Sequence, residues 1–271
     1  MAGKSVEKYA AKKITVPEVR GETLYGFHPV LESLRAGKRD VYGCYLKKTV
    51  LTRAENDQKI AEILKTLDSL GVEKNVLSDD QLDRLTEFQL HNGICLDVSK
   101  LEFVNYEPRR LSIFVDNVLD PGNLGAIARS AWYFGADGIS YANRRGPKSI
   151  TPSMSKSSCG ALEHLPIEKL ANFDAFRDKI KSKNGKIVAT CDPKAAEKLG
   201  IKAKLLKDWK PSENVAIVLG DEGVGIGDRI LNLCDSVVSI NAVRKNGSNV
   251  TSLNVSVVAA ILLHHISSNQ Q

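Results

Sequence analysis

Three stretches of the chain carry polar side chains in patterns that suit a ligand site. In the first, Val237–His265, a β-branched run precedes a polar loop and the apolar segment Val255–Leu263. A helix that is apolar on nearly every side must be covered on each face. Thr251 or Ser252 is placed to cap this helix, with Ser252 and Asn254 beside free backbone N–H groups at its first turn. The pattern fits either a ligand pocket at a helix mouth or ordinary capping.

The second stretch, Asp116–Gly138, is a polar turn followed by a predicted helix. Asp120 and Pro121 make a good helix start. Asn123 and Arg129 both lie off the apolar stripe of that helix, and they are six residues apart. At about 100° per residue they face different sides. A small ligand could then contact both only through a bend or a second subunit, and a solvated helix start with a surface arginine is the alternative.

The third stretch, Ile217–Gly227, runs from a strand into a glycine-rich loop, which allows close backbone approach by a ligand. The spacing of its last three glycines resembles a dinucleotide-binding or ordinary methyltransferase loop. Those loops follow the first strand of their domain, whereas only 44 residues remain after Gly227. No GxxxxGK[ST] motif occurs, which excludes a P-loop NTPase.

Composition narrows the class of protein further. The 271 residues carry a net charge of +6, and the first fifty hold ten Lys and Arg against five Asp and Glu. A basic N-terminal part favours an anionic partner, nucleic acid first, although a solvated basic surface is an equal alternative. The five cysteines are scattered without a Cys-x-x-Cys pair, which predicts free thiols and no metal site. No apolar run approaches the ~20 residues of a membrane helix, so we expect no membrane partner.

The elements that must position these stretches alternate between helix and strand. We expect a flexible basic tail over residues 1–20, a small α/β domain over 21–99, a polar linker over 100–110 and a second α/β domain over 111–271. Helices are predicted over Phe27–Arg35, Asn56–Leu70, Ser78–Phe88, a stretch starting at Asp120-Pro121, Thr151–Leu162 and Phe173–Lys183. Strands are predicted over Val41–Leu46, Val72–Leu77, Ile94–Val98, Leu111–Val115, Gly138–Tyr141, Lys186–Thr190, Val215–Leu219 and Val237–Ile240. Such alternation predicts a three-layer sandwich for the first domain and a mainly parallel sheet for the second domain.

Taken together and in this order, the three stretches resemble motifs 1, 2 and 3 of the SpoU (TrmH-type) family of SPOUT RNA 2′-O-ribose methyltransferases. The first motif is matched by Asp116, Asp120, Pro121, Asn123, Gly125 and Arg129. The second is matched by Gly220, Glu222, Gly223 and Gly225, and the third by Ser252–Ser256. Residues 21–99 resemble the L30e-like RNA-binding domain that precedes this fold, through the entry Tyr25–Val30 and the exit His91–Ile94. The run 143–160 is most similar to mitochondrial guanosine-2′-O rRNA methyltransferases.

The resemblance implies transfer of a methyl group from S-adenosylmethionine, within a C-terminal α/β trefoil-knot domain and an obligate homodimer. The implied catalytic set is Asn123, Arg129, Glu222, Ser252 and Asn254. The implied cofactor contacts are Thr190, Gly220, Ile240 and Leu253. We expect the basic residues Arg144, Arg145, Lys148 and Lys156 to contact RNA. One departure is the loop between Ile240 and Ser252, which is longer than usual in the family.

The expected substrate is a guanosine in large-subunit rRNA, since a separate L30e-like domain is uncommon in the tRNA enzymes of the family. A tRNA 2′-O-methyltransferase is the main alternative. A noncatalytic rRNA-binding assembly protein is the second alternative, but it would not need the catalytic set. Similarity to the mitochondrial enzymes predicts a location in the mitochondrial matrix, with cytoplasm as the alternative. Residues 1–20 include Glu7 and Glu18 and would make a poor transit peptide, so a targeting segment could be missing from this sequence.

Overall fold

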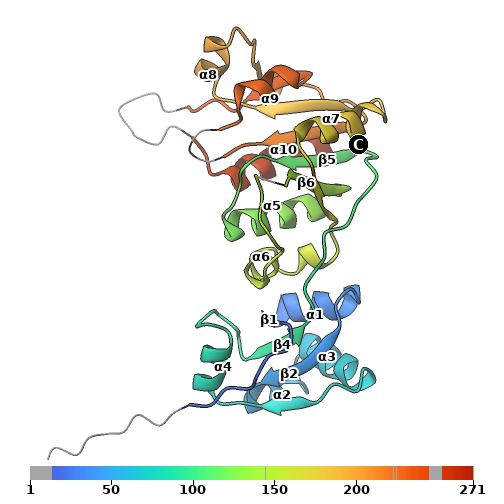
Figure 1. Cartoon of the computed structure of the whole chain (residues 1–271), viewed down its shortest axis with the longest axis vertical. Coiled ribbons are helices and arrows are strands. Elements are labelled where there is room, and N and C mark those ends of the chain that lie inside the picture. The colour runs from blue at the N-terminus through green and yellow to red at the C-terminus, as the bar shows by residue number, and fades with distance from the viewer. Residues whose placement is uncertain (1–13, 144, 222, 224, 244–251, 271) are drawn as a thin grey trace, which may run out of the picture.

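The structure is a computed structural model that describes residues 14–143, 145–221, 223, 225–243 and 252–270. Figure 1 shows two α/β parts, joined by an extended segment after residue 98 and packed against each other near α6 (Pro152–Ser157). The α/β class with a smaller N-terminal part is therefore confirmed. Within the described residues, no helix is long and apolar enough to cross a bilayer.

The N-terminal part is a mixed four-stranded sheet with helices on both faces. Its elements are β1 (Glu22–Tyr25), α1 (Phe27–Ala36), β2 (Val41–Leu46), α2 (Lys48–Arg53), α3 (Gln58–Ser69), β3 (Lys74–Val76), α4 (Asp79–Leu85) and β4 (Ile94–Val98). The strand order is β1-β4-β2-β3, antiparallel except between β2 and β3. Leu31 of α1 and Ile63 of α3 pack on one face of the sheet, while Leu82 and Leu85 of α4 pack on the other. The expected three-layer sandwich is confirmed.

The C-terminal part is built on a parallel sheet with seven strands among the described residues. Its first elements are β5 (Leu111–Val115), α5 (Pro121–Tyr133), β6 (Gly138–Ala142), α6, η1 (Ala161–Glu163), β7 (Ile167–Leu170), α7 (Phe173–Lys181) and β8 (Lys186–Thr190). Then follow α8 (Pro193–Lys198), β9 (Lys204–Leu205), η2 (Leu206–Asp208), β10 (Val215–Leu219), α9 (Asp228–Leu233), β11 (Ser236–Ser239) and α10 (Val255–Asn269). The strand order β7-β6-β5-β10-β8-β11-β9 places β10 beside β5, although β10 comes late in the chain.

Helices cover both faces of this sheet, which explains its apolar central strands. Every residue of β5 and of β10 is buried, as expected for parallel strands enclosed on both sides. Ile127 of α5 and Leu262 of α10 belong to the core on one face. Phe176 of α7 and Ile230 of α9 belong to the core on the other face. The sheet therefore holds the carboxyl ends of β5 and β10 rigidly side by side.

Several predicted boundaries are confirmed, and one predicted helix is wrong. Asp120 caps α5 by accepting a hydrogen bond from the Asn123 backbone N–H at 2.8 Å, with Pro121 at the first helical position. The helix expected over Thr151–Leu162 instead ends at Ser157 and resumes as the short η1. Cys159 and Gly160 between them adopt left-handed backbone angles, with φ of 53° and 84°, which no α-helix accommodates. That break turns η1 toward the N-terminal part.

A buried ion pair joins the two parts of the chain. Arg39, which precedes β2, donates from Nε to Oε2 of Glu163 at 2.8 Å and from Nη2 to Oε1 at 3.1 Å. Both side chains are fully buried. Ser155 donates to Oε1 of the same carboxylate at 2.6 Å, and Arg39 also pairs with Glu22 at 2.5 Å. Burial opposes the charged form of Arg39, but these two carboxylates raise its pKa overall.

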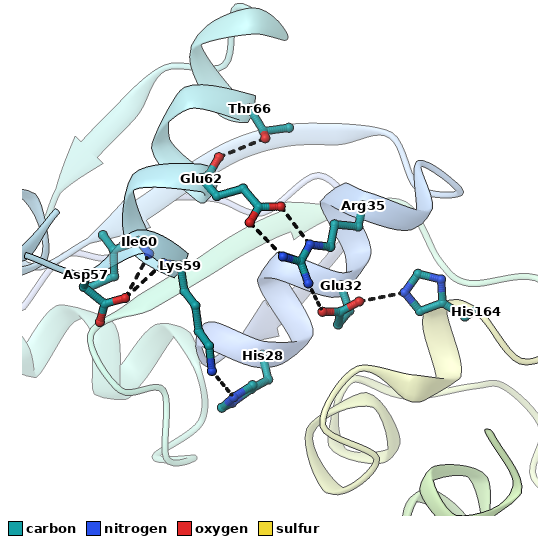
Figure 2. A network of polar contacts seen from close by, with 9 residues as sticks. All are labelled: His28, Glu32, Arg35, Asp57, Lys59, Ile60, Glu62, Thr66 and His164. Atoms are coloured by element: carbon teal, nitrogen blue, oxygen red, sulfur yellow. Dashed lines mark hydrogen bonds and ion pairs between the residues drawn. The ribbon is translucent and has the colours of Figure 1, made fainter. Parts of the chain in front are cut away.

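A second polar link between the two parts lies at the protein surface. Figure 2 shows His164, which follows η1, directed at Glu32 of α1, with 2.8 Å between Nε2 and Oε2. Arg35 also contacts Glu32 at 2.8 Å and Glu62 of α3 at 2.7 Å. The N-terminal part therefore meets α6 and η1 through defined polar contacts at the interface. The trefoil knot stays a prediction, because residues 244–251 lie outside the described part of the chain.

Candidate functional site

The three sequence stretches meet at the carboxyl ends of β5 and β10. Chain order reverses between these strands, since β6 and β7 lie beyond β5 while β8 and β11 lie beyond β10. In open parallel sheets such a switch point is where ligands bind. Asp116 and Asn117 follow β5, and Gly220 and Asp221 follow β10. The fold therefore places the first and second stretches at one edge of the sheet.

Two hydrogen bonds fasten the first stretch to the second. The backbone N–H of Asp116 donates to the carbonyl oxygen of Leu219 at 2.8 Å. The side-chain amide of Asn117 donates to Oδ2 of Asp221 at 2.5 Å. Asn117 has a left-handed φ of 62°, a region that asparagine tolerates better than most residues. The strand ends are therefore held by the turn that precedes α5.

One hydrogen bond joins the first stretch to the third. Asn254 donates from Nδ2 to Oδ1 of Asn123 at 3.0 Å, across 131 residues of chain. Its Oδ1 also accepts from the backbone N–H of Ser256 at 2.8 Å, so Asn254 is the N-cap of α10. The prediction that Thr251 or Ser252 caps this helix is therefore wrong. Either hydroxyl residue could cap a helix, but the helix starts later, where a single amide both caps it and contacts α5.

The predicted catalytic residues are only partly brought together. Asn123 is half-buried, while Asn254 and Ser252 are exposed at the start of α10. Arg129 is exposed on α5, on the side turned toward the N-terminal part. The different orientations expected for Asn123 and Arg129 are consistent with this placement. Glu222 lies outside the described residues.

Three of the four predicted cofactor residues lie at neighbouring strand ends. Thr190 ends β8, Gly220 follows β10 and Ile240 follows β11. Leu253, in front of α10, is 49% exposed. A Cβ at Gly220 would come within 2.6 Å of the backbone of Gly225 and Ile226, so this glycine is needed by the packing of its own loop. The four residues stay a prediction for cofactor binding.

The predicted RNA contacts lie in different surroundings. The Nε of Arg145 lies 2.7 Å from Oδ1 of the buried Asp116, although Arg145 is itself 48% exposed. Burial raises the pKa of Asp116, and the charge of Arg145 opposes that shift. Lys148 is exposed, and Lys156 donates to Oδ1 of Asn92 in the N-terminal part at 2.9 Å. Arg144 lies outside the described residues.

Sequence reasoning missed the structural roles of Asn117 and Asp221. Both directly follow buried strands, and that position is the signal that could have found them. Asp116 was read as part of a motif, but its pairing with Arg145 was not foreseen. Among the described residues, no group of histidine, cysteine and acidic side chains is placed to hold a metal ion.

One side of α10 is not covered within a single chain, contrary to the burial on every face that its sequence predicts. Val257 is 44% exposed, while Ala260 and Ile261 are half-buried. A shallow depression runs between this side and α5, lined by Ala126, Ser130, Ser256, Val257, Ala260, Ile261 and His264. The uncovered side is mainly apolar, unlike an ordinary solvated helix face.

Comparison with known proteins assigns both parts of the chain. Residues 110–264 match the SpoU rRNA Methylase family, and residues 23–104 match the family described as RNA 2′-O ribose methyltransferase substrate binding. The human protein "rRNA methyltransferase 1, mitochondrial" is 31% identical over 273 residues, which cover 94% of this chain and 75% of that protein.

Two crystal structures share the fold of the whole chain. The SpoU methyltransferase AviRb from Streptomyces viridochromogenes has a TM-score of 0.71 at 21% identity, covering 92% of this chain and 89% of that one. The AdoMet-bound rRNA methyltransferase from Sinorhizobium meliloti has a TM-score of 0.69 at 17% identity, covering 91% and 86%.

Proposed function

Because this chain belongs to the SpoU rRNA methylase family, we propose that it methylates a ribose 2′-hydroxyl of RNA with S-adenosylmethionine as methyl donor. The observation that carries the proposal is the hydrogen bond between Asn123 and Asn254. This hydrogen bond joins the first family motif to the third, next to the strand ends that carry the second motif. The N-terminal part, which matches the substrate-binding family, supplies the RNA contacts.

The residues at the strand ends fit S-adenosylmethionine. Thr190, Gly220 and Ile240 lie at the carboxyl ends of three neighbouring parallel strands, where backbone groups are available to hold a nucleoside. Leu253, in front of α10, presents an exposed apolar side chain suited to one face of an adenine ring. The sulfonium of the bound cofactor would supply an electrophilic methyl group.

A ribose 2′-hydroxyl is a poor nucleophile until its proton leaves or its developing negative charge is stabilised. Arginine stays protonated in proteins, so Arg129 acts as a hydrogen-bond donor that orients the ribose or a neighbouring phosphate and stabilises the developing alkoxide. Asn123 and Asn254 hold the geometry, with Ser252 beside them. We assign to Glu222 the role of orienting Arg129 or Asn123. In the transfer the 2′-oxygen would take the methyl group, the sulfur would keep the electron pair of the broken carbon–sulfur bond, and the hydroxyl proton would pass to solvent water.

The finer substrate assignment is a guanosine in large-subunit rRNA, with the chain located in the mitochondrial matrix. The human relative, named as a mitochondrial rRNA methyltransferase, supports an rRNA substrate and a mitochondrial location. The guanosine rests on the resemblance of residues 143–160 to the guanosine-2′-O enzymes, and the large subunit on the presence of the separate substrate-binding domain. A tRNA substrate and a cytoplasmic location are the alternatives.

The experiment that tests the function is methyl transfer from labelled S-adenosylmethionine to ribosomal RNA and to tRNA. We expect label in rRNA, in dinucleotides that resist alkali because a 2′-O-methyl group blocks attack on the adjacent phosphate. Label in tRNA alone would support the alternative substrate. Calorimetry of S-adenosylmethionine with the protein separates a missing cofactor site from a missing RNA substrate, and NAD serves as a control that should not bind. No cofactor binding with or without RNA would contradict the proposal.

The uncovered side of α10 supports a homodimer whose two subunits build each site together. An apolar helix side of this kind suits a permanent interface between copies of the chain. Arg129 lies about 120° around α5 from Asn123, which supports a site that the partner's copy of Arg129 completes. The shared site is a proposal that the following mixing experiment tests.

Two inactive variants, Arg129→Ala and Gly220→Ala, should complement each other. In Gly220→Ala the new Cβ displaces the loop at Gly225, while Arg129 is intact. If Arg129 acts on the partner's site, each mixed dimer has one working site. A statistical mixture of dimers then recovers about a quarter of full activity. Co-refolded and separately folded mixtures are compared in the methylation assay, and inactive mixed dimers would show that each chain builds its own site.

A further inference from the structure

Four nitrogen-bearing side chains from both parts of the chain gather where α1 and α3 face the methyltransferase domain. His28 lies in the first turn of α1 and Lys59 in the first turn of α3. Lys59 Nζ lies 3.2 Å from His28 Nε2, and Figure 2 shows the two side chains directed at each other. Lys156 of α6 and Arg129 of α5 come from the other domain. We call His28, Lys59, Lys156 and Arg129 the interdomain basic cluster.

The positive charges of this cluster act on one imidazole. Burial lowers the pKa of His28, and the charges of Lys59, Lys156 and Arg129 lower it further, in that order. All three cations therefore lie within Coulombic range of the His28 ring. The neutral ring accepts a hydrogen bond from the Lys59 ammonium at Nε2, which leaves Nδ1 as a hydrogen-bond donor.

Little negative charge balances the cluster. Among the residues that the structure describes, none of the ion pairs includes Lys59, Lys156 or Arg129. Glu32 acts on His28 as well, but Arg35 and His164 each contact that carboxylate at 2.8 Å. A group of like charges that outnumbers the acidic side chains beside it favours binding of an anion.

The Lys156 ammonium reaches the backbone of the N-terminal part at Gly26. Gly26, between β1 and α1, has a left-handed φ of 90°, and a Cβ there would overlap the Lys156 ammonium. The same ammonium donates to Asn92 at 2.9 Å and lies 6.0 Å from the centre of the Tyr25 ring. Burial lowers the pKa of Lys156. Its position is fixed by neutral neighbours, which leaves its charge available to a ligand.

We propose that the interdomain basic cluster is a binding site for the phosphate backbone of the RNA substrate. The inference rests on the proposed function and adds a path for the RNA strand. The strand crosses from the N-terminal domain to α5 over His28, Lys59 and Lys156. Arg129 of the same chain then lies beside the ribose that follows the bound phosphates. The N-terminal domain thereby presents RNA to the arginine of its own chain.

The test measures binding of a fluorescein-labelled RNA stem-loop with a single-stranded arm by the full-length protein, as fluorescence anisotropy over a range of KCl concentrations. Lys59→Gln and Lys156→Gln should each raise Kd several-fold and reduce the slope of log Kd against log salt by about 1. Lys65→Gln is the matched control, because Lys65 is exposed on another side of α3. Within the described part of the chain, the Lys59 ammonium contacts His28 and forms no ion pair, so its replacement should not disturb folding.

Unchanged salt slopes in both variants, or slopes reduced equally by Lys65→Gln, would overturn the proposal. RNA binding by the unaltered protein that does not depend on salt would overturn it as well. Because this assay needs no methyl transfer, its outcome is independent of the proposed activity. In the methylation assay, Lys59→Gln should raise KM for RNA several-fold and leave kcat unchanged. A fall in kcat at constant KM would place Lys59 in the chemical step instead.

Discussion

Arg129→Ala is expected to lower the rate of methyl transfer by on the order of 10³-fold, close to complete loss in most assays. The substitution removes the donor that we assign to the developing alkoxide of the ribose. Folding should be little affected, because Arg129 is exposed on α5 and lies off its buried stripe. The measurement is single-turnover methyl transfer, together with the melting temperature and the affinity for S-adenosylmethionine.

Two further variants separate the explanations for that loss. Arg109→Ala removes another exposed arginine, in the linker just before β5, and should leave the rate unchanged. Arg129→Lys keeps the charge but not the planar, forked donor, and we expect it to recover only a small part of the rate. Near-normal turnover in Arg129→Ala would contradict the catalytic assignment. Unfolding of that variant would show that the arginine has a structural role.

Glu163→Ala should lower the free energy of unfolding by about 3–5 kcal/mol, since it leaves a buried cation without its main partner. Arg39 and Glu163 are both fully buried between the two parts of the chain. Glu22 and the carbonyl oxygen of Ser99 would remain as the contacts of Nη1, and Nε would lose its acceptor. Denaturant titration measures the change, and separate transitions for the two parts would show that the pair couples them.

The control is Glu62→Gln in the exposed pair with Arg35, where the melting temperature should stay close to that of the unaltered protein. The double variant Arg39→Met with Glu163→Leu should recover part of the lost stability, because apolar side chains replace both members of the buried pair while Glu22 loses its partner. If Glu163→Ala unfolds at the same denaturant concentration as the unaltered protein, the ion pair does not hold the parts together.

Sequence alone determined the central elements of both domains and the order of the motifs. Leu111–Val115, Lys186–Thr190 and Val215–Leu219 are strands with the predicted bounds, because near-continuous apolar runs of this length suit buried parallel strands. Local chemistry likewise placed the start of α5 at Asp120, which caps that helix. The short strands β1, β7 and β9 were missed, since runs of two to four residues carry little periodicity.

Only the tertiary structure decided how these elements make a site. The sequence pattern predicts Thr251 or Ser252 as the cap of α10, whereas in the structure Asn254 caps the helix and also contacts Asn123. The apolar composition of α10 predicted burial on every face. Which side stays uncovered depends on the helices that pack beside it, and only the fold shows them. Arg145 stays a predicted RNA contact, and only the fold shows that it also pairs with Asp116. Hydrogen bonds, packing and ion pairs of this kind join residues far apart in the chain, and their partners follow from strand order rather than from local sequence.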